Sequence, residues 1–358
     1  MISFIVEFYN QPKLAPDSTW CENGIVYPYT NNDLYQPRSI FVDKNDAVYV
    51  SFDQEGIVIV WSKGNETPWR IYHGNSTSTN LSSVSNVLLK SYNSFQDFLQ
   101  SIGEWWNNWW KYSSDKDKLA VPNSLFVTSN GDIYVGQGSG SRIVIWKYDS
   151  TRGEILLKAD EACYGLFVDT NDTIYCSLKK KDQIKIKSIK YSNTTWTIRA
   201  SEVFGFVRQR NLDGPYGIFV HMNFGLYVTE YNTNKILLFE PGQTTGRKLV
   251  EDNLNGPTNI VLDIDANLYI VDSNEHRVVF VAAGEDQIRC LVGCPGNRNT
   301  PMRLPTSLSF DSFGNILVSD THHNRVLKFQ REINSCGKSC RILILLHVIV
   351  PIFVCKIR

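Results

Sequence analysis

One sequence pattern occurs six times in this chain of 358 residues. Each copy has a short apolar run, a polar turn and a second apolar run with an aromatic or aliphatic residue at its centre. These central residues are Tyr49, Tyr134, Tyr175, Tyr227, Tyr269 and Leu317. Apart from a longer first interval, the copies lie roughly forty to fifty residues apart, a period typical of arrays whose units bury faces against one another.

The runs have the composition of β-strands. SIFVD, LYV and ILLFE are short, rich in β-branched and aromatic residues, and bounded by turn residues. A third and a fourth run follow in most copies, such as EILLK at 154–158 and RKLV at 247–250. Each unit is therefore expected to be a four-stranded antiparallel meander, and six such units predict an all-β, six-bladed β-propeller.

The two ends of the repeat array complement each other. The last copy ends near residue 330 without a fourth run, and the strand-like segment TWCENGIVYP precedes the first copy. We expect this segment, about residues 18–30, to complete blade six, because an unpaired blade edge is a liability. The predicted propeller thus spans 1–330, and 331–358 form an apolar, cysteine-containing tail.

The most regular copies carry a recognisable motif. GPYGIFVHMNFGLYVTEYNTNKILLFEPG and GPTNIVLDIDANLYIVDSNEHRVVFVAAG resemble NHL repeats, and residues 20–330 as a whole are similar to the NHL-repeat propellers abundant in small aquatic invertebrates. The resemblance implies a propeller fold. It also implies one of three functions: binding of a protein or other ligand, binding of RNA, or a metal-dependent lyase of the peptidyl-hydroxyglycine type.

Acidic and basic residues recur at matching offsets after the second strand of the last three copies. A carboxylate that closes a turn and pairs with a base at the next strand is expected to act as a structural clasp. The predicted pairs are Glu230 with Lys235, Asp272 with Arg277, and Asp320 with Arg325. The aspartates that open the first turn suit tight hairpins in the same way: Asp43, Asp169, Asp263 and Asp311.

Histidine placement bears on the enzyme hypothesis. The lyase branch of the resembled family holds zinc with several converging histidines. Here His221 falls in a first turn, whereas His276, His322 and His323 fall in second turns of the last two blades. We therefore expect a non-enzymatic protein with no cofactor and no catalytic or metal-binding residues, and keep the metal-dependent lyase as the alternative.

A ring of variable residues is expected at one mouth of the propeller channel. Each lies directly before the small residue that opens an inner strand, and together they offer aromatic, cationic, amide and hydroxyl groups suited to recognition. They are Arg38, Asn123, Tyr164, Tyr216, Thr258 and Thr306. We expect them to bind a protein, peptide or glycan; the alternative is that they are turn residues with varied side chains.

The long first interval contains apolar residues at helical spacing. From Leu88 to Trp109 they recur every three or four positions, which predicts an amphipathic helix over 86–112 within an insertion at about 81–118, between blades one and two. Its tryptophans suit an interface with a partner or a membrane surface: Trp105, Trp106, Trp109 and Trp110. Packing of this face on the chain's own domain is the favoured interpretation, and docking of a partner or a membrane is the alternative.

Charge and cysteine content bear on partners and compartment. The net charge is zero, which argues against nucleic acid, and the lysine run 179–181 is interpreted as a solvated turn. Locally paired cysteines fit an oxidising environment, with Cys163, Cys176, Cys290 and Cys294 as disulfide candidates. Neither a convincing signal peptide nor a full membrane span is recognised. A monomeric extracellular or membrane-associated protein is expected.

Overall fold

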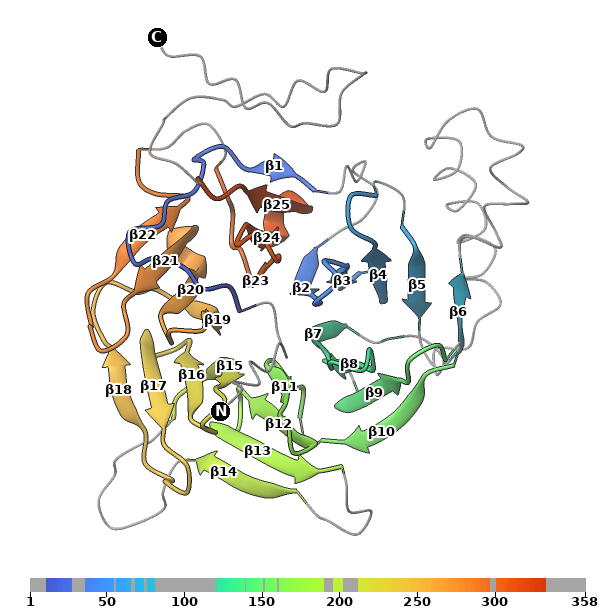
Figure 1. Ribbon diagram of the computed structural model, residues 1–358. Coiled ribbons are helices and arrows are strands. Elements are labelled where there is room, and N and C mark those ends of the chain that lie inside the picture. The colour runs from blue at the N-terminus through green and yellow to red at the C-terminus, as the bar shows by residue number, and fades with distance from the viewer. Residues whose placement is uncertain are drawn as a thin grey trace, which may run out of the picture.

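The computed structural model describes residues 11–27, 36–54, 56–65, 68–73, 76–80, 119, 121–138, 140–150, 152–159, 161–189, 196–201, 212–296 and 301–332. These residues form a six-bladed β-propeller, with antiparallel blades arranged around a central channel (Figure 1). The fold class predicted from the repeats is confirmed, including four strands per blade.

The first three blades follow one another in chain order. Blade one contains β2 (Pro37–Val42), β3 (Val48–Phe52), β4 (Ile57–Trp61) and β5 (Arg70–His73), with β6 (Ser76–Asn80) added at its outer edge. Blade two contains β7 (Pro122–Val127), β8 (Ile133–Gln137), β9 (Arg142–Trp146) and β10 (Glu154–Lys158). Blade three contains β11 (Leu166–Val168), β12 (Thr173–Leu178), β13 (Gln183–Ser188) and β14 (Thr197–Ser201).

The last three blades continue the ring. Blade four contains β15 (Pro215–Val220), β16 (Leu226–Glu230), β17 (Lys235–Phe239) and β18 (Arg247–Val250). Blade five contains β19 (Pro257–Leu262), β20 (Leu268–Asp272), β21 (Arg277–Val281) and β22 (Arg289–Val292). Blade six contains β23 (Ser307–Phe310), β24 (Ile316–Asp320) and β25 (Arg325–Phe329), and its outer strand is the N-terminal β1 (Ile25–Val26).

Burial on both faces explains the composition of the second strands. Every residue of β8, β16 and β20 is buried, because neighbouring blades cover both sides of each sheet. Continuous apolar runs are expected for such strands. The largest fully buried side chains include Trp61, Trp146 and Phe239, so the core lies between the blades.

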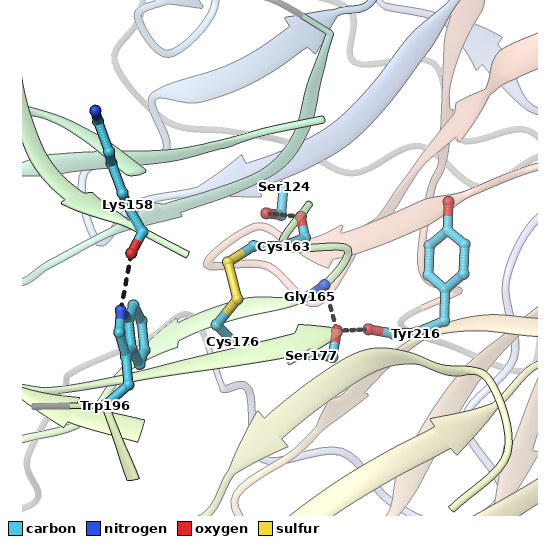
Figure 2. The surroundings of a disulfide bond; sticks show 8 residues. All are labelled: Ser124, Lys158, Cys163, Gly165, Cys176, Ser177, Trp196 and Tyr216. Carbon is cyan, nitrogen blue, oxygen red and sulfur yellow. Dashed lines mark hydrogen bonds between the residues drawn. A yellow bond between two sulfur atoms is a disulfide. The ribbon is translucent and has the colours of Figure 1, made fainter. Parts of the chain in front are cut away.

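Small residues let adjacent blades approach closely. A Cβ placed on Gly165 would lie 2.4 Å from the carbonyl oxygen of Tyr216 in the next blade. In the same junction the Ser177 hydroxyl accepts the Gly165 N–H at 2.6 Å and donates to the Tyr216 carbonyl at 2.5 Å, as Figure 2 shows. These bonds hold the backbone of the inner strands while leaving the Tyr216 side chain to face the channel mouth.

Two of the three predicted clasps are ion pairs. Asp272 lies 2.8 Å from Arg277, and Asp320 lies 2.8 Å from Arg325. Both carboxylates are fully buried, and each also accepts a backbone N–H, from Asn255 and Arg303 respectively.

The third clasp requires a correction. Glu230 accepts hydrogen bonds from the Asp213 N–H (2.8 Å) and the Thr233 hydroxyl (2.5 Å). These bonds occupy both carboxylate oxygens of Glu230. Lys235 instead pairs with Glu251 at 3.1 Å. The equal spacing of acid and base in the three blades therefore indicates a shared turn, but it does not determine which carboxylate pairs with the basic residue.

The turn aspartates support their hairpins. Asp263 accepts the N–H groups of Asp265 and Asn267 at 3.0 and 2.9 Å and the Tyr269 hydroxyl at 3.2 Å. Asp43 and Asp169 make the same three kinds of contact in their own blades. A carboxylate at this position thus ties the first turn to the second strand.

Two disulfides lie within the described residues, and both join predicted pairs. Cys163 and Cys176 have Cα atoms 5.2 Å apart beside the β11–β12 ladder, and Cys290 and Cys294 have theirs 5.7 Å apart at the end of β22. Figure 2 shows the first bond beside the junction between blades two and three. Here the Ser124 hydroxyl of blade two donates to the Cys163 carbonyl at 2.8 Å.

The predicted helical insertion is not supported. Residues 81–118, with Trp105, Trp106, Trp109 and Trp110, lie outside the described residues, as does the tail from 333 onward. The helices among the described residues are two short 3-10 turns, η2 (Ser273–Glu275) and η3 (Thr321–His323). Within that part of the chain, no helix is long and apolar enough to cross a membrane.

Candidate functional site

The six residues predicted to ring the channel mouth line one cavity of about 620 Å³. They reach it because each lies at the same position of an inner strand or of the segment leading into it: Arg38, Asn123, Tyr164, Tyr216, Thr258 and Thr306. A cavity of this size matches the volume typical of ligand pockets.

Three tyrosines form an aromatic wall on one side of the mouth. The ring centroids of Tyr164 and Tyr216 are 5.1 Å apart, and those of Tyr216 and Tyr231 are 6.0 Å apart. All three side chains are half-buried. Burial raises the pKa of Tyr216, although Arg38 opposes the rise through its charge and a hydrogen bond. The Tyr216 phenol is therefore neutral at physiological pH and can donate a hydrogen bond.

Lys179 extends over this wall. Its ammonium lies 3.5 Å from the ring centroid of Tyr231, 5.2 Å from that of Tyr216 and 5.8 Å from that of Tyr164. The residue is half-buried, and this burial lowers the pKa of its amine. The lysine run at 179–181 is thus more than a solvated turn, because its first residue makes cation–π contacts within the mouth.

Arg38 enters the mouth from blade one. It pairs with Asp53, the residue that follows β3, with a guanidinium–carboxylate distance of 2.8 Å. Its charge also acts on Tyr216, which belongs to blade four. Arg38 therefore contributes a cation whose charge is largely balanced within the protein.

The threonines of the ring serve the scaffold. The Thr306 hydroxyl donates to the carbonyl oxygen of Arg38 at 2.6 Å, and the Thr258 hydroxyl donates to that of Pro305 at 3.4 Å. Both threonines are buried. Their hydroxyls join adjacent blades, so the mouth's recognition chemistry comes mainly from its aromatic and charged residues.

A belt of phenylalanines narrows the channel below the mouth. Ring centroids are 5.3 Å apart for Phe41 and Phe126, 4.7 Å for Phe126 and Phe167, and 5.3 Å for Phe167 and Phe219. Each ring belongs to an inner strand, three positions after a mouth residue. The space around the belt is about 90 Å³ and is also lined by Gln11. The mouth is therefore a cup with an apolar floor.

The histidines occupy separate positions in the described part of the chain. His221 contacts Asn223 in its turn, His276 contacts the Ser273 carbonyl, and His323 contacts Asp320, while His322 lines the cup. The cup lining contains one imidazole and one carboxylate, Glu161. This donor set does not match the several histidines that a zinc lyase requires. Among the described residues, no three His, Cys, Asp or Glu side chains group as metal ligands.

A second ring of cup residues was missed in the sequence analysis. They follow directly after the second strands of blades three to six and are Lys179, Tyr231, Ser273 and Thr321. The repeat alignment could have found them, because they occupy one shared position next to the expected clasp acids.

Comparison with known proteins supports the fold alone. No protein-family model matches the chain, and no curated protein matches it. A catalytically inactive virginiamycin B lyase from Staphylococcus aureus, solved with quinupristin, has a TM-score of 0.54 at 13% identity over 87% of this chain and 99% of that chain. An auxiliary nutrient binding protein from Bacteroides ovatus has a TM-score of 0.59 at 14% identity over 91% and 76%.

A third solved structure extends this range. A chain of a nidogen–laminin complex has a TM-score of 0.50 at 15% identity, over 79% of this chain and 92% of that chain. The chain therefore has the propeller fold of proteins with varied functions, and at these identities fold similarity assigns none of those functions. Membership of the NHL-repeat family is not confirmed.

Proposed function

We propose that this protein is a non-enzymatic binding module that recognises a protein, peptide or glycan ligand at the cup-shaped channel mouth. The observation that carries the proposal is the convergence of Tyr164, Tyr216, Tyr231, Arg38 and Lys179 on one cavity of about 620 Å³. Partly exposed aromatic and arginine side chains in a concave site are the groups that most often anchor partners.

The contrast between scaffold and mouth supports the same proposal. Inner strands keep small residues and hydroxyls that join the blades, as at Gly165 and Ser177. The six mouth positions, in contrast, carry an arginine, an asparagine, two tyrosines and two threonines. In such a scaffold, function is carried by the side chains of a site and not by the fold itself.

An extracellular location is part of this proposal. Two disulfides occur within the described residues, and such bonds persist in oxidising compartments. One of the similar structures is a nutrient-binding protein and another comes from the nidogen–laminin complex, so propellers of this shape occur in binding roles. These similarities motivate a search for ligands outside the cell.

A two-step experiment tests the proposal. Immobilised protein is first screened against a peptide library and a glycan array, and hydrogen exchange is then measured with and without the strongest hit. We expect protection to rise at residues 179–182, 231–234 and the segments before β11 and β15. Protection confined to the outer strands β14, β18 and β22 would place binding elsewhere and contradict the proposed site.

A further inference from the structure

The charge of Lys179 has no acidic partner in the part of the chain that the structure describes. Among the described residues, no carboxylate lies within ion-pair distance of its ammonium, and the cup's carboxylate, Glu161, accepts the backbone N–H of Lys180 at 2.9 Å. The contacts described for the Lys179 ammonium are the faces of Tyr231, Tyr216 and Tyr164. An ammonium partly removed from water is stabilised best by a counter-charge, which these rings replace only in part.

We propose that the cup binds an acidic peptide segment, with Lys179 as the anchor for a carboxylate of that peptide. This inference rests on the proposed binding function and names its ligand class. The ligand carboxylate completes the pairing of the Lys179 ammonium, and the three tyrosine rings hold that ammonium in the mouth before the ligand arrives. Such preorganisation lowers the entropy cost of binding.

The remaining charges of the cup favour an anion. Its lining contains Arg38, Lys179 and Lys180 but one carboxylate, Glu161. Arg38 is already paired with Asp53, which leaves Lys179 as the cation best placed to accept a new partner. Tyr216, whose phenol is neutral at physiological pH, lies next to both cations and supplies a hydrogen-bond donor.

The hydroxyl groups favour a peptide over a sugar. A polyhydroxylated ligand requires free hydrogen-bonding groups around the mouth. Here the hydroxyls of Thr306, Thr258 and Thr321 already donate to the backbone carbonyls of neighbouring segments, Arg38, Pro305 and Pro37 respectively. The tyrosine rings and Lys179 in the lining are groups that contact apolar and acidic side chains of peptides.

Selection from a random heptapeptide library tests this inference. Wild-type protein, Lys179→Met and Lys181→Met are used as separate baits; Lys181 is an exposed lysine of the same turn outside the cup lining, so its variant is the matched control. We expect Asp or Glu to be enriched at one position with wild type and with Lys181→Met, but not with Lys179→Met. The affinity of the best peptide should fall about tenfold in Lys179→Met.

A substitution in the selected peptide gives a second readout, because its effect on binding to wild-type protein does not depend on the folding of a protein variant. Replacing the enriched Asp by Asn should weaken binding to wild type about tenfold and should add little loss with Lys179→Met, as expected for directly coupled groups. Enrichment of neutral or basic residues, with binding still mapped to the cup by hydrogen exchange, would overturn the acidic-ligand inference alone. Binding of glycans but of no peptide would overturn it as well. Hydrogen exchange with the bound glycan would then show whether the cup is still the binding site.

Discussion

Val26 of β1 pairs with Leu327 of β25, so a strand from the beginning of the chain forms the outer edge of the last blade (Figure 1). Trp20 extends this closure through a bridge to Arg331 and an indole N–H bond to the Gly314 carbonyl at 2.8 Å. Its ring also meets Tyr269 of blade five edge-on at 6.1 Å. The closure thus combines backbone pairing with a buried aromatic side chain.

Truncation of Trp20 should destabilise the ring. The side chain is 5% exposed, and we expect Trp20→Ala to lower the free energy of unfolding by about 3–5 kcal/mol, the range for large buried aromatic residues. Trp69, which is 39% exposed, is the matched control, and Trp69→Ala should cost about 1 kcal/mol or less. Urea unfolding measures both. Equal losses of unfolding free energy in the two variants would show that burial of Trp20 does not stabilise the closure of blade six by the N-terminal strand.

Loss of a buried clasp acid should cost more than loss of the half-buried base Lys235. Asp320 is fully buried and accepts bonds from Arg303, His323 and Arg325, so Asp320→Ala should destabilise the protein by about 3–5 kcal/mol. Lys235 pairs with the half-exposed Glu251, and Lys235→Ala should cost about 1 kcal/mol or less. Thermal and urea unfolding measure both losses. A larger loss for Lys235→Ala than for Asp320→Ala would contradict the structural role of the buried acid.

Removal of the two disulfides should have unequal effects. Cys163 and Cys176 are separated by 13 positions and are buried, whereas Cys290 and Cys294 are separated by four. Cross-links that close longer loops restrict the unfolded chain more, so the Cys163→Ala/Cys176→Ala variant should lose about 3 kcal/mol and the other pair less. Urea unfolding of the two double variants beside wild type checks this order. Equal losses, or a larger loss on removal of Cys290 and Cys294, would contradict it.

Asp46 should make the junction between blades one and six sensitive to acid. Burial alone would raise the pKa of this carboxyl, but bonds from Lys63 and from both Ser312 donors outweigh it and hold the pKa below the ordinary 3.8. The charged form therefore stabilises the fold near neutral pH, and this contribution is lost as pH falls through the lowered pKa.

Comparison with Asp46→Asn isolates that contribution. We expect the variant to be less stable than wild type by ~2 kcal/mol at pH 7, as for hydrogen bonds to a charged group. The difference should shrink as pH is lowered below about 4. Urea titrations at both pH values measure it. A difference that stays constant, or one that grows in acid, would show that ionisation of Asp46 does not support the junction.

Repeats made the fold predictable from sequence. Each second strand is buried on both faces, so its apolar run recurs at every copy, as in β16 and β20. The register of these runs also identified the mouth positions, because Tyr164 and Tyr216 hold the same place relative to a small residue that must lie against the next blade.

The contacts of individual side chains were less predictable. Lys235 occupies the same repeat position as Arg277 and Arg325. Its ammonium nevertheless pairs with Glu251, because both oxygens of Glu230 accept other hydrogen bonds. Lys179 appeared to be one of three solvated lysines, because its tyrosine neighbours belong to other strands and other blades. The Lys179 contacts depend on inter-blade geometry, which a single repeat does not encode.

Affinity measurements on the two mouth tyrosines test the central claim most directly. With the strongest ligand from the screen, isothermal titration should show that Tyr164→Ala and Tyr216→Ala each weaken binding at least about tenfold, the loss typical of an aromatic anchor. Tyr148, which is 66% exposed outside the cup, is the matched control, and Tyr148→Ala should bind like wild type. Unchanged affinity in both mouth variants, with circular dichroism showing an intact fold, would contradict binding at the cup.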